Sequence, residues 1–272
     1  MSRKLQLLVK GITHPLLGFR FIWFRIDSKF KLTKKMKVSN DMERLVVDDW
    51  NSALVSRDFV VLAHVQRYLW VQPYLSNLVC LDAGCGAGYG THFLAVNGVN
   101  KMVGVDISYE AIKYDKSEFK AANLEFKQMS VTKLEFVSDS FDAVISFDVL
   151  EHLTEVDQRK FIAEVARVLK PVGAAYIGCP NAKRTVSLTN PFHLRELLRE
   201  EFELLLNQYF QDVAVLGQDI IYEGVRQEEN IDTKVPNLSL ANLIIVEDGY
   251  AHGLLSICKK PRKVLGQKGM GK

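Results

Sequence analysis

The sequence lacks several patterns that would define its chemistry or its location at once. It has four cysteines: Cys80, Cys85, Cys179 and Cys258. No two of them form a CxxC pair or show metal-ligand spacing, so we expect reduced thiols and no metal site. No apolar run approaches the ~20 residues that a membrane-spanning helix needs. Lys10 and the His14-Pro15 pair interrupt any secretory signal. These absences favour a cytosolic globular protein.

Basic residues are unevenly distributed along the 272-residue chain. Its 48% hydrophobic and 25% charged residues are ordinary for one large domain, or for one domain with an extension. Residues 1–37 contain ten Lys or Arg and one acid, whereas the remainder carries 25 basic and 31 acidic residues, a net charge of −6. We therefore divide the chain into a basic, aromatic-rich extension, residues 1–40, and a domain, residues 41–272.

The extension also contains apolar and aromatic side chains, among them Phe21, Trp23 and Phe24. Aromatic residues among lysines suit a segment lying on an anionic membrane surface, here the inner one. The same residues could stack on single-stranded nucleic acid. In a third interpretation the apolar side chains pack on the domain and the lysines are solvated. The sequence leaves these three interpretations open.

From about residue 52, apolar runs of strand length alternate with helical patterns. We predict helices at 56–72, 89–97, 109–121, 156–169 and 193–207. We predict strands at 78–83, 102–106, 123–128, 142–147, 173–179, 210–216 and 254–258, and a polar loop or insertion at 218–240. Such alternation predicts a parallel α/β sheet covered by helices on both faces.

A glycine loop, GCGAGYG, directly follows the first predicted strand and precedes a helix. In an open parallel sheet this is where ligands bind. The dinucleotide pattern GxGxxG would require glycine where Tyr89 or Thr91 stands, and no GK[ST] of a P-loop occurs. Asp82 before the loop would repel a pyrophosphate but suits an ammonium group, and Asp106 after the second strand suits ribose hydroxyls. The ligand therefore resembles a nucleoside joined to an amino acid.

Four motifs in order resemble the class I S-adenosylmethionine-dependent methyltransferases, of the type 11 kind, over roughly residues 55–260. They are LDAGCGAGYG, VGVDIS, FDAVISFDVLEHL and ARVLKPVGAAYIGCPN. The resemblance implies a doubly wound, Rossmann-like sheet of seven strands with the last one antiparallel. It also implies S-adenosylmethionine as cofactor, a cofactor half at about 55–180 and acceptor-side elements at about 181–250.

The resemblance assigns cofactor roles to individual residues. Asp82 would lie near the ammonium group, and Asp106 would hold the ribose hydroxyls. The other implied cofactor contacts are Gly84, Gly86 and Gly88 along the methionine and ribose, Ile107 on the adenine face, and Phe147 at the methionine end. Where many relatives have an aspartate for the adenine amino group, this chain has Ser130.

Two further matches point to a branch of the family. His64, Arg67 and Tyr68 resemble an HxxRY element of relatives that act on carbohydrates, and Arg67 could pair with the cofactor carboxylate. Packing and surface roles explain Arg67 and Tyr68 equally well. Residues 190–218 are similar to a stretch of sugar and cell-surface polysaccharide methyltransferases.

The candidates for a catalytic base are Asp148, His152 and His193. Removal of a proton from a sugar hydroxyl would suit a histidine. Roles in loop structure or on the cofactor side are equally consistent with these positions, and alignment of a nucleophilic acceptor could suffice without a base.

The sequence therefore predicts an enzyme that transfers a methyl group by in-line displacement to a hydroxyl, or an amine, of a sugar or glycan intermediate. A quinone or another small molecule is the alternative acceptor. A non-catalytic, membrane-associated scaffold is the alternative from another class. Nucleic acid is disfavoured as a substrate because the domain is acidic and no NPPY-type sequence follows the fourth strand.

Overall fold

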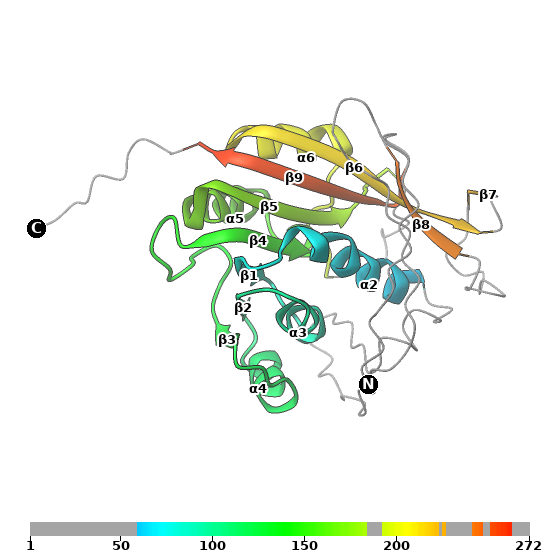
Figure 1. The fold of residues 1–272 in the computed structure, drawn as a ribbon. Helices are drawn as coiled ribbons and strands as arrows, with labels where there is room; N and C mark the ends of the chain where they lie inside the picture. The colour runs from blue at the N-terminus through cyan, green and yellow to red at the C-terminus, as the bar shows by residue number, and fades with distance from the viewer. Residues whose placement is uncertain (1–58, 184–191, 223–224, 227–240, 247–250, 263–272) are drawn as a thin grey trace, which may run out of the picture.

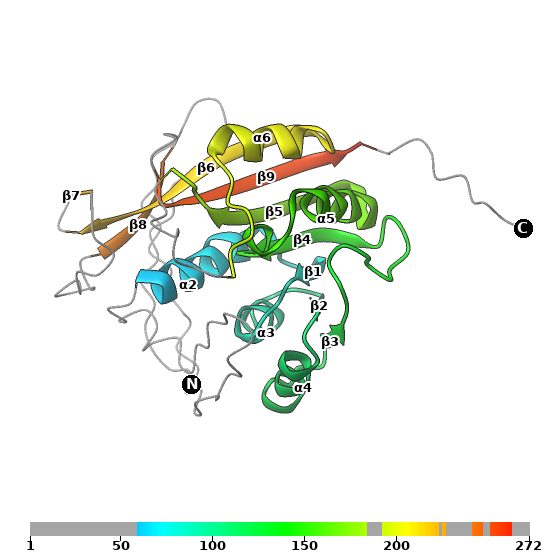
Figure 2. The ribbon, with the colours of Figure 1, turned by 180° about the vertical axis from the view of Figure 1, so that it is seen from behind.

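The computed structural model describes residues 59–183, 192–222, 225–226, 241–246 and 251–262. The basic extension and the first residues of the predicted helix 56–72 lie outside these ranges. Figures 1 and 2 show one twisted sheet with helices on both of its faces. No helix among the described residues is long and apolar enough to cross a membrane.

The described elements alternate along the chain much as predicted. The helices are α2 (Phe59–Val71), α3 (Tyr89–Val96), α4 (Tyr109–Glu118), α5 (Glu155–Val168) and α6 (Arg199–Asn207), with short 3-10 turns η1 (Gln72–Tyr74) and η2 (Leu150–His152). The strands are β1 (Val79–Ala83), β2 (Lys101–Asp106), β3 (Leu124–Gln128), β4 (Phe141–Phe147), β5 (Leu169–Pro180), β6 (Phe210–Tyr222), β7 (Val225–Arg226), β8 (Ala241–Val246) and β9 (Gly253–Pro261).

Seven of these strands form the predicted doubly wound sheet, in the order β3-β2-β1-β4-β5-β9-β6. The pairings among β1 to β5 are parallel. The last strand, β9, lies between β5 and β6 and is antiparallel to both. The carboxyl ends of β1, β2, β4 and β5 therefore share one edge of the sheet with the start of β9. The predicted fold class is confirmed.

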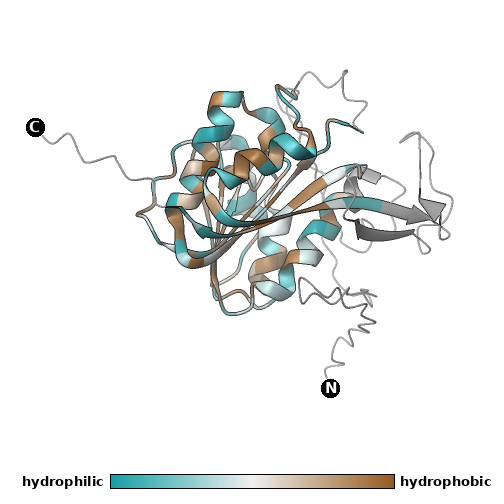
Figure 3. Cartoon of the chain, turned by 90° about the horizontal axis from the view of Figure 1, so that it is seen from above, coloured by the Kyte–Doolittle hydropathy of each residue, from teal (hydrophilic) through white to brown (hydrophobic). Residues whose placement is uncertain are grey.

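Each face of the sheet has its own hydrophobic core. Val65 of α2, Leu94 of α3 and Ile112 of α4 belong to one cluster of buried residues. Phe161 of α5 and Phe202 of α6 belong to the other. Figure 3 shows the helices on either side of the sheet, with hydrophilic positions on their outer surfaces. Burial on both faces explains why the parallel strands read as continuous apolar runs.

Two predicted elements differ from the structure. The predicted helix 193–207 begins only at Arg199. The residues before it are held in an irregular path, because Leu194 and Arg195 donate their backbone N–H groups to the Glu151 carbonyl at 2.7 and 3.1 Å. Tertiary hydrogen bonds thus replace the first helical turn.

The prediction of a polar loop at 218–240 is also wrong in part. Strand β6 continues to Tyr222, β7 follows, and residues 227–240 lie outside the described ranges. The sequence analysis missed β8, whose residues 241–246 pair with the distal half of β6. The short apolar runs of these strands, IIY at the end of β6 and LIIV in β8, stand among polar residues, and their pairing with each other identifies them as strands.

Gly90 in the first turn of α3 allows Tyr68 of α2 to pack against it. A Cβ at Gly90 would lie 2.1 Å from Cζ of the Tyr68 ring. We expect Gly90→Ala to lower the free energy of unfolding by about 1–3 kcal/mol through overpacking, measured by urea denaturation. The cost should shrink by at least ~1 kcal/mol in a Tyr68→Leu background, and additive effects of the two substitutions would contradict the packing argument.

Candidate functional site

The glycine loop between β1 and α3 passes through left-handed backbone conformations at Gly84, Gly86 and Gly88, with φ of 85°, 57° and 67°. A Cβ at Gly84 would lie 2.3 Å from Val149, and one at Gly88 would lie 2.6 Å from Asp115. At Gly86 nothing lies within 4 Å of such a Cβ. Protein packing therefore requires Gly84 and Gly88, whereas Gly86 borders open space that a ligand can enter.

Asp106 at the end of β2 is fixed toward this loop. Its Oδ2 accepts a hydrogen bond from the Gly86 N–H at 3.1 Å, and its Oδ1 accepts one from the Ser108 N–H at 2.9 Å. Two backbone donors orient the carboxylate without consuming all of its acceptor capacity. Asp106 is thus held at the mouth of the loop, where the predicted ribose hydroxyls would lie.

Asp82 in β1 is fully buried beneath the same loop. Its Oδ2 accepts hydrogen bonds from the hydroxyls of Thr91 at 2.6 Å and Tyr68 at 3.2 Å. Its Oδ1 has no hydrogen-bond partner among the described residues. Burial raises the pKa of Asp82 to about 6, against the opposing effect of the two hydroxyls. A buried carboxylate with one unpaired oxygen is suited to a cationic ligand.

The side of the site predicted for adenine is more open. Ile107 follows Asp106 and is 58% exposed, which is unusual for a large apolar side chain next to a buried strand. Ser130, beyond β3, lies within 2.9 Å of the Thr132 hydroxyl. The Met129 N–H donates to the Asp106 carbonyl at 2.9 Å, which ties this segment to the end of β2. Ile107 and Ser130 are thereby brought to the same end of the sheet as Asp106.

Helix α2 fixes Asp148, the first residue after β4. His64 Nε2 lies 2.5 Å from Asp148 Oδ2, and Arg67 forms an ion pair with the same oxygen. Although burial opposes it, the charges of Arg67 and His64 hold the pKa of Asp148 below its usual range. Asp148 also adopts a φ of 53°, a strained conformation for a residue other than glycine. This aspartate is ionised and held in position, and such a low pKa makes it a weak base.

Arg67 has a second buried partner that the sequence analysis missed. Its Nε donates to Gln218 Oε1 of β6 at 2.6 Å, and Gln218 Nε2 donates to the Ala63 carbonyl at 3.0 Å. Arg67 is thus engaged by protein side chains at the place where the sequence analysis predicted a cofactor carboxylate. Phe147, also predicted at the methionine end, is buried and packs edge-to-face on Tyr68 with ring centroids 5.3 Å apart.

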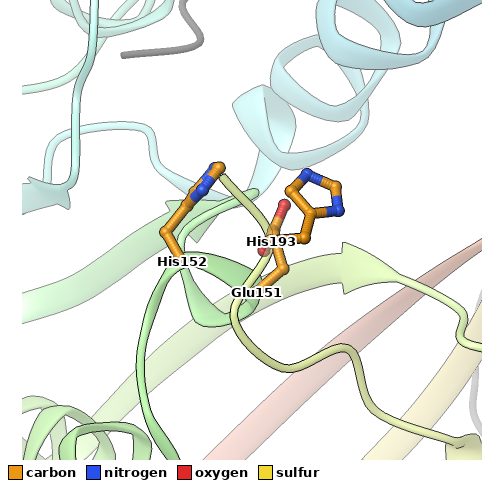
Figure 4. A group of neighbouring side chains, drawn as sticks. All are labelled: Glu151, His152 and His193. Atoms are coloured by element: carbon orange, nitrogen blue, oxygen red, sulfur yellow. The ribbon is translucent and has the colours of Figure 1, made fainter. Parts of the chain in front are cut away.

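The turn η2 brings Glu151 and His152 against His193 (Figure 4). A ligand atom of each of the three residues lies within 4.8 Å of the other two. Burial raises the pKa of the Glu151 carboxyl well above its usual range. The predicted base candidates His152 and His193 therefore belong to one cluster, although 41 residues separate them in the sequence.

Further polar residues gather at the same edge of the sheet. Asp219, fully buried in β6, lies 2.7 Å from His252 Nδ1 just before β9. Asn181 after β5 donates its side-chain N–H to the Ala251 carbonyl at 2.7 Å. The sequence analysis named none of these three residues. In the sequence, these residues are marked only by their position as polar residues next to apolar strand segments.

Comparisons with known proteins agree with this geometry. Residues 81–177 match the family described as "Methyltransferase domain". A probable S-adenosylmethionine-dependent methyltransferase of Mycobacterium tuberculosis is 35% identical over 168 residues, which are 60% of this chain and 58% of that protein. A ubiquinone biosynthesis O-methyltransferase of Pelagibacter ubique is 30% identical over 172 residues, 62% of this chain and 65% of that protein. The chain thus covers less than two thirds of the length of these relatives.

A solved structure supports the fold. A Thermotoga maritima S-adenosylmethionine-dependent methyltransferase, a possible histamine N-methyltransferase, superposes with a TM-score of 0.57 at 14% identity. The match covers 73% of this chain and 89% of that chain. At this identity the likeness concerns the fold alone.

The residues present fit S-adenosylmethionine, the cofactor of this family of domains. The unpaired Oδ1 of Asp82 suits an ammonium group, and the open space at Gly86 lets a ligand approach the main chain. Asp106, held by two backbone N–H groups, keeps acceptor capacity for hydroxyls. These contacts are compatible with the cofactor roles predicted for Asp82, Gly86 and Asp106, which stay predictions.

The raised pKa of Asp82 predicts a pH-dependent affinity for the cofactor. Above about pH 6 the carboxylate is ionised and can accept the ammonium group, and below this it must first lose a proton. Calorimetric titration with S-adenosylmethionine should therefore give a dissociation constant about tenfold higher at pH 5 than at pH 7. Asp82→Asn should bind weakly and without this pH dependence. Asp106→Ala, the control, should bind at least ~10-fold more weakly at both pH values and keep it. Equal pH profiles for the native protein and Asp82→Asn would contradict the assignment.

Proposed function

Because the chain carries a class I S-adenosylmethionine-dependent methyltransferase domain, we propose that the protein methylates an oxygen, or a nitrogen, of a sugar or glycan intermediate. The observation that carries the choice of acceptor is the polar edge of the sheet beyond β4 and β5. Hydrogen-bonding side chains that are only partly buried gather there: His152, His193, Glu196 and His252. A polyhydroxylated acceptor needs such donors and acceptors.

The bound cofactor supplies a methyl group on a positively charged sulfur. The residues of this chain hold the cofactor and orient it, with Asp82 toward the ammonium group and Asp106 toward the ribose. Asp148 does not need to exchange a proton for this task. Its ion pairs with Arg67 and His64 hold the end of β4 against α2. They thereby fix the position of the segment between β4 and η2.

We assign the removal of the acceptor proton to the cluster of Glu151, His152 and His193. The three predicted base candidates differ here. Contacts with Arg67 and His64 lower the pKa of Asp148 against the effect of burial, whereas His152 and His193 lie together in the cluster. The His152 and His193 ring centroids are 5.2 Å apart. A hydroxyl acceptor bound next to η2 would lie beside this cluster.

A quinone or another small aromatic molecule is the second candidate acceptor. It is favoured by the similarity to ubiquinone biosynthesis O-methyltransferases, which extends to 65% of the length of one relative. The exposed Leu194, which follows His193 in the chain, and the exposed Leu198 before α6 offer apolar surface for such a ring. The two candidates share the transfer of a methyl group to a hydroxyl oxygen and differ in the surface that binds the rest of the acceptor.

An activity assay separates these acceptors. Methyl transfer from labelled S-adenosylmethionine should be measured with sugar nucleotides, lipid-linked saccharides and hydroxylated quinone precursors. We expect turnover with a saccharide, and we expect His152→Ala and His193→Ala each to lower kcat by about 10²-fold or more while S-adenosylmethionine affinity stays within ~2-fold. Turnover with a quinone precursor alone would assign the second candidate. Tight cofactor binding without turnover on any acceptor would favour the non-catalytic scaffold.

We also propose that residues 1–37 of the basic extension contact an anionic membrane surface on which a lipid-linked acceptor would lie. Its support is the charge asymmetry of the sequence, with ten basic residues and one acid. Each lysine near an anionic surface contributes about 1 kcal/mol to binding.

Vesicle flotation of the full chain tests this proposal. The protein should float with vesicles containing phosphatidylserine and stay behind with phosphatidylcholine alone. Replacement of Lys29, Lys31, Lys34, Lys35 and Lys37 by glutamine should abolish flotation at physiological salt. Equal recovery of native and substituted protein in the unbound fraction would remove the proposal.

A further inference from the structure

Glu151, His152 and His193 form a set of two imidazoles and one carboxylate, drawn from η2 and from the segment before α6 (Figure 4). Two histidines and a carboxylate are a common ligand set for divalent transition metals, which prefer imidazole nitrogen with carboxylate oxygen. The ligand atoms lie within 4.8 Å of one another. Tetrahedral coordination at ~2.1 Å per bond places ligand atoms closer than this, so a modest rotation of the side chains would close the site.

Both histidines are oriented as metal ligands usually are. His152 Nδ1 lies 3.0 Å from the Phe192 carbonyl oxygen, which can only accept, so Nδ1 carries the proton. His193 Nδ1 lies 2.5 Å from Glu196 Oε1 and donates to that carboxylate. In a neutral imidazole, a protonated Nδ1 leaves Nε2 as the nitrogen with the lone pair. Carbonyl and carboxylate partners of this kind fix the tautomer and ring orientation of metal-binding histidines.

Glu151 provides an independent indication. The residue is 2% exposed, and its Oε2 has no hydrogen-bond partner among the described residues. A buried carboxylate oxygen without a partner is costly, and a cation would remove the cost. The Glu151 carbonyl accepts hydrogen bonds from the N–H groups of Leu194 and Arg195. Through its carbonyl, Glu151 therefore binds the His193 segment to η2. Its carboxylate lies between the rings of His152 and His193 (Figure 4).

We propose that Glu151, His152 and His193 bind one divalent transition-metal ion of the Zn²⁺ class, with at least one coordination position left for another ligand. Glu196 and the Phe192 carbonyl would support the two histidines from behind. Tertiary structure creates this site, and no spacing in the sequence marks it.

The metal would also explain how the cluster removes the acceptor proton, a consequence that rests on the proposed function. A hydroxyl at the open position would have its pKa lowered by the cation and would release its proton to solvent. The electron pair of the oxygen then forms the bond to the methyl carbon, while the electrons of the carbon–sulfur bond remain on sulfur. The histidines act as ligands in this scheme, and no separate base is required.

Metal binding is tested first without any acceptor. The full chain, produced without a histidine tag and stripped with a chelator, should be titrated with Zn²⁺ by calorimetry and with Co²⁺ by visible absorption. We expect one equivalent of either ion per chain and Co²⁺ d–d bands that disappear on addition of excess Zn²⁺. A folded, stripped protein that takes up neither ion would overturn the proposal.

Substitutions then locate the site. His152→Ala, His193→Ala and the isosteric Glu151→Gln should each weaken binding by about 100-fold or more, and Glu196→Gln by about 10-fold. His92→Ala is the matched control. Its ring stacks on Phe119 with centroids 5.0 Å apart, far from the cluster in sequence. Its affinity for the metal should be unchanged. Metal binding that survives all three ligand substitutions would place the ion elsewhere and overturn the assignment.

Titration of the same samples with S-adenosylmethionine separates this inference from the proposed function. Cofactor binding with no metal uptake would reject the metal site and leave the methyltransferase assignment intact. If the native protein does not bind S-adenosylmethionine, the proposed function is rejected. The metal titration would still show whether the metal site exists. Circular dichroism of each variant shows whether a lost affinity reflects lost folding.

Discussion

The site depends on the contact of one helix with two carboxylates. On one face of α2, His64 and Arg67 hold Asp148 at the end of β4, and Tyr68 donates to Asp82 in β1. Asp82 is fully buried and the Asp148 side chain is only 15% exposed, and charges largely removed from water persist only with partners. The helix therefore sets the relative position of the cofactor loop and the end of β4. Asp82 is also held by Thr91 of α3, whereas the ion-pair partners of Asp148, His64 and Arg67, both lie on α2.

The sheet and the cofactor loop could be predicted from the sequence because their signals are local. Strand β1, the glycines and the start of α3 are continuous in the chain, and the left-handed conformations at Gly84, Gly86 and Gly88 explain the residue type directly. Buried parallel strands also read as apolar runs whatever their neighbours are. The fold class, the seven-stranded core and the placement of Asp82 and Asp106 follow from such signals.

The rest of the site could not be predicted because it is made by contacts between distant segments. Gln218 meets Arg67 across 151 residues, and no feature of the surrounding strand indicates this partner. The segment before α6 was predicted as helix, but hydrogen bonds to the Glu151 carbonyl hold it in another conformation. The HxxRY pattern singled out His64, Arg67 and Tyr68, whereas the contacts of His64 and Arg67 with Asp148 and Gln218 required the structure.

Gly253 at the start of β9 packs against a residue that comes from the other end of the domain. A Cβ there would lie 3.0 Å from Gln218 Oε1 and 3.1 Å from Arg67 Nη2. The last strand thus leaves room for an arginine that the chain contributes almost 190 residues earlier. A chimera that takes its final strand from a relative with a larger residue at this position would displace the Arg67–Gln218 pair. A design that exchanges the final strand should therefore treat Arg67, Gln218 and Gly253 as one packing unit.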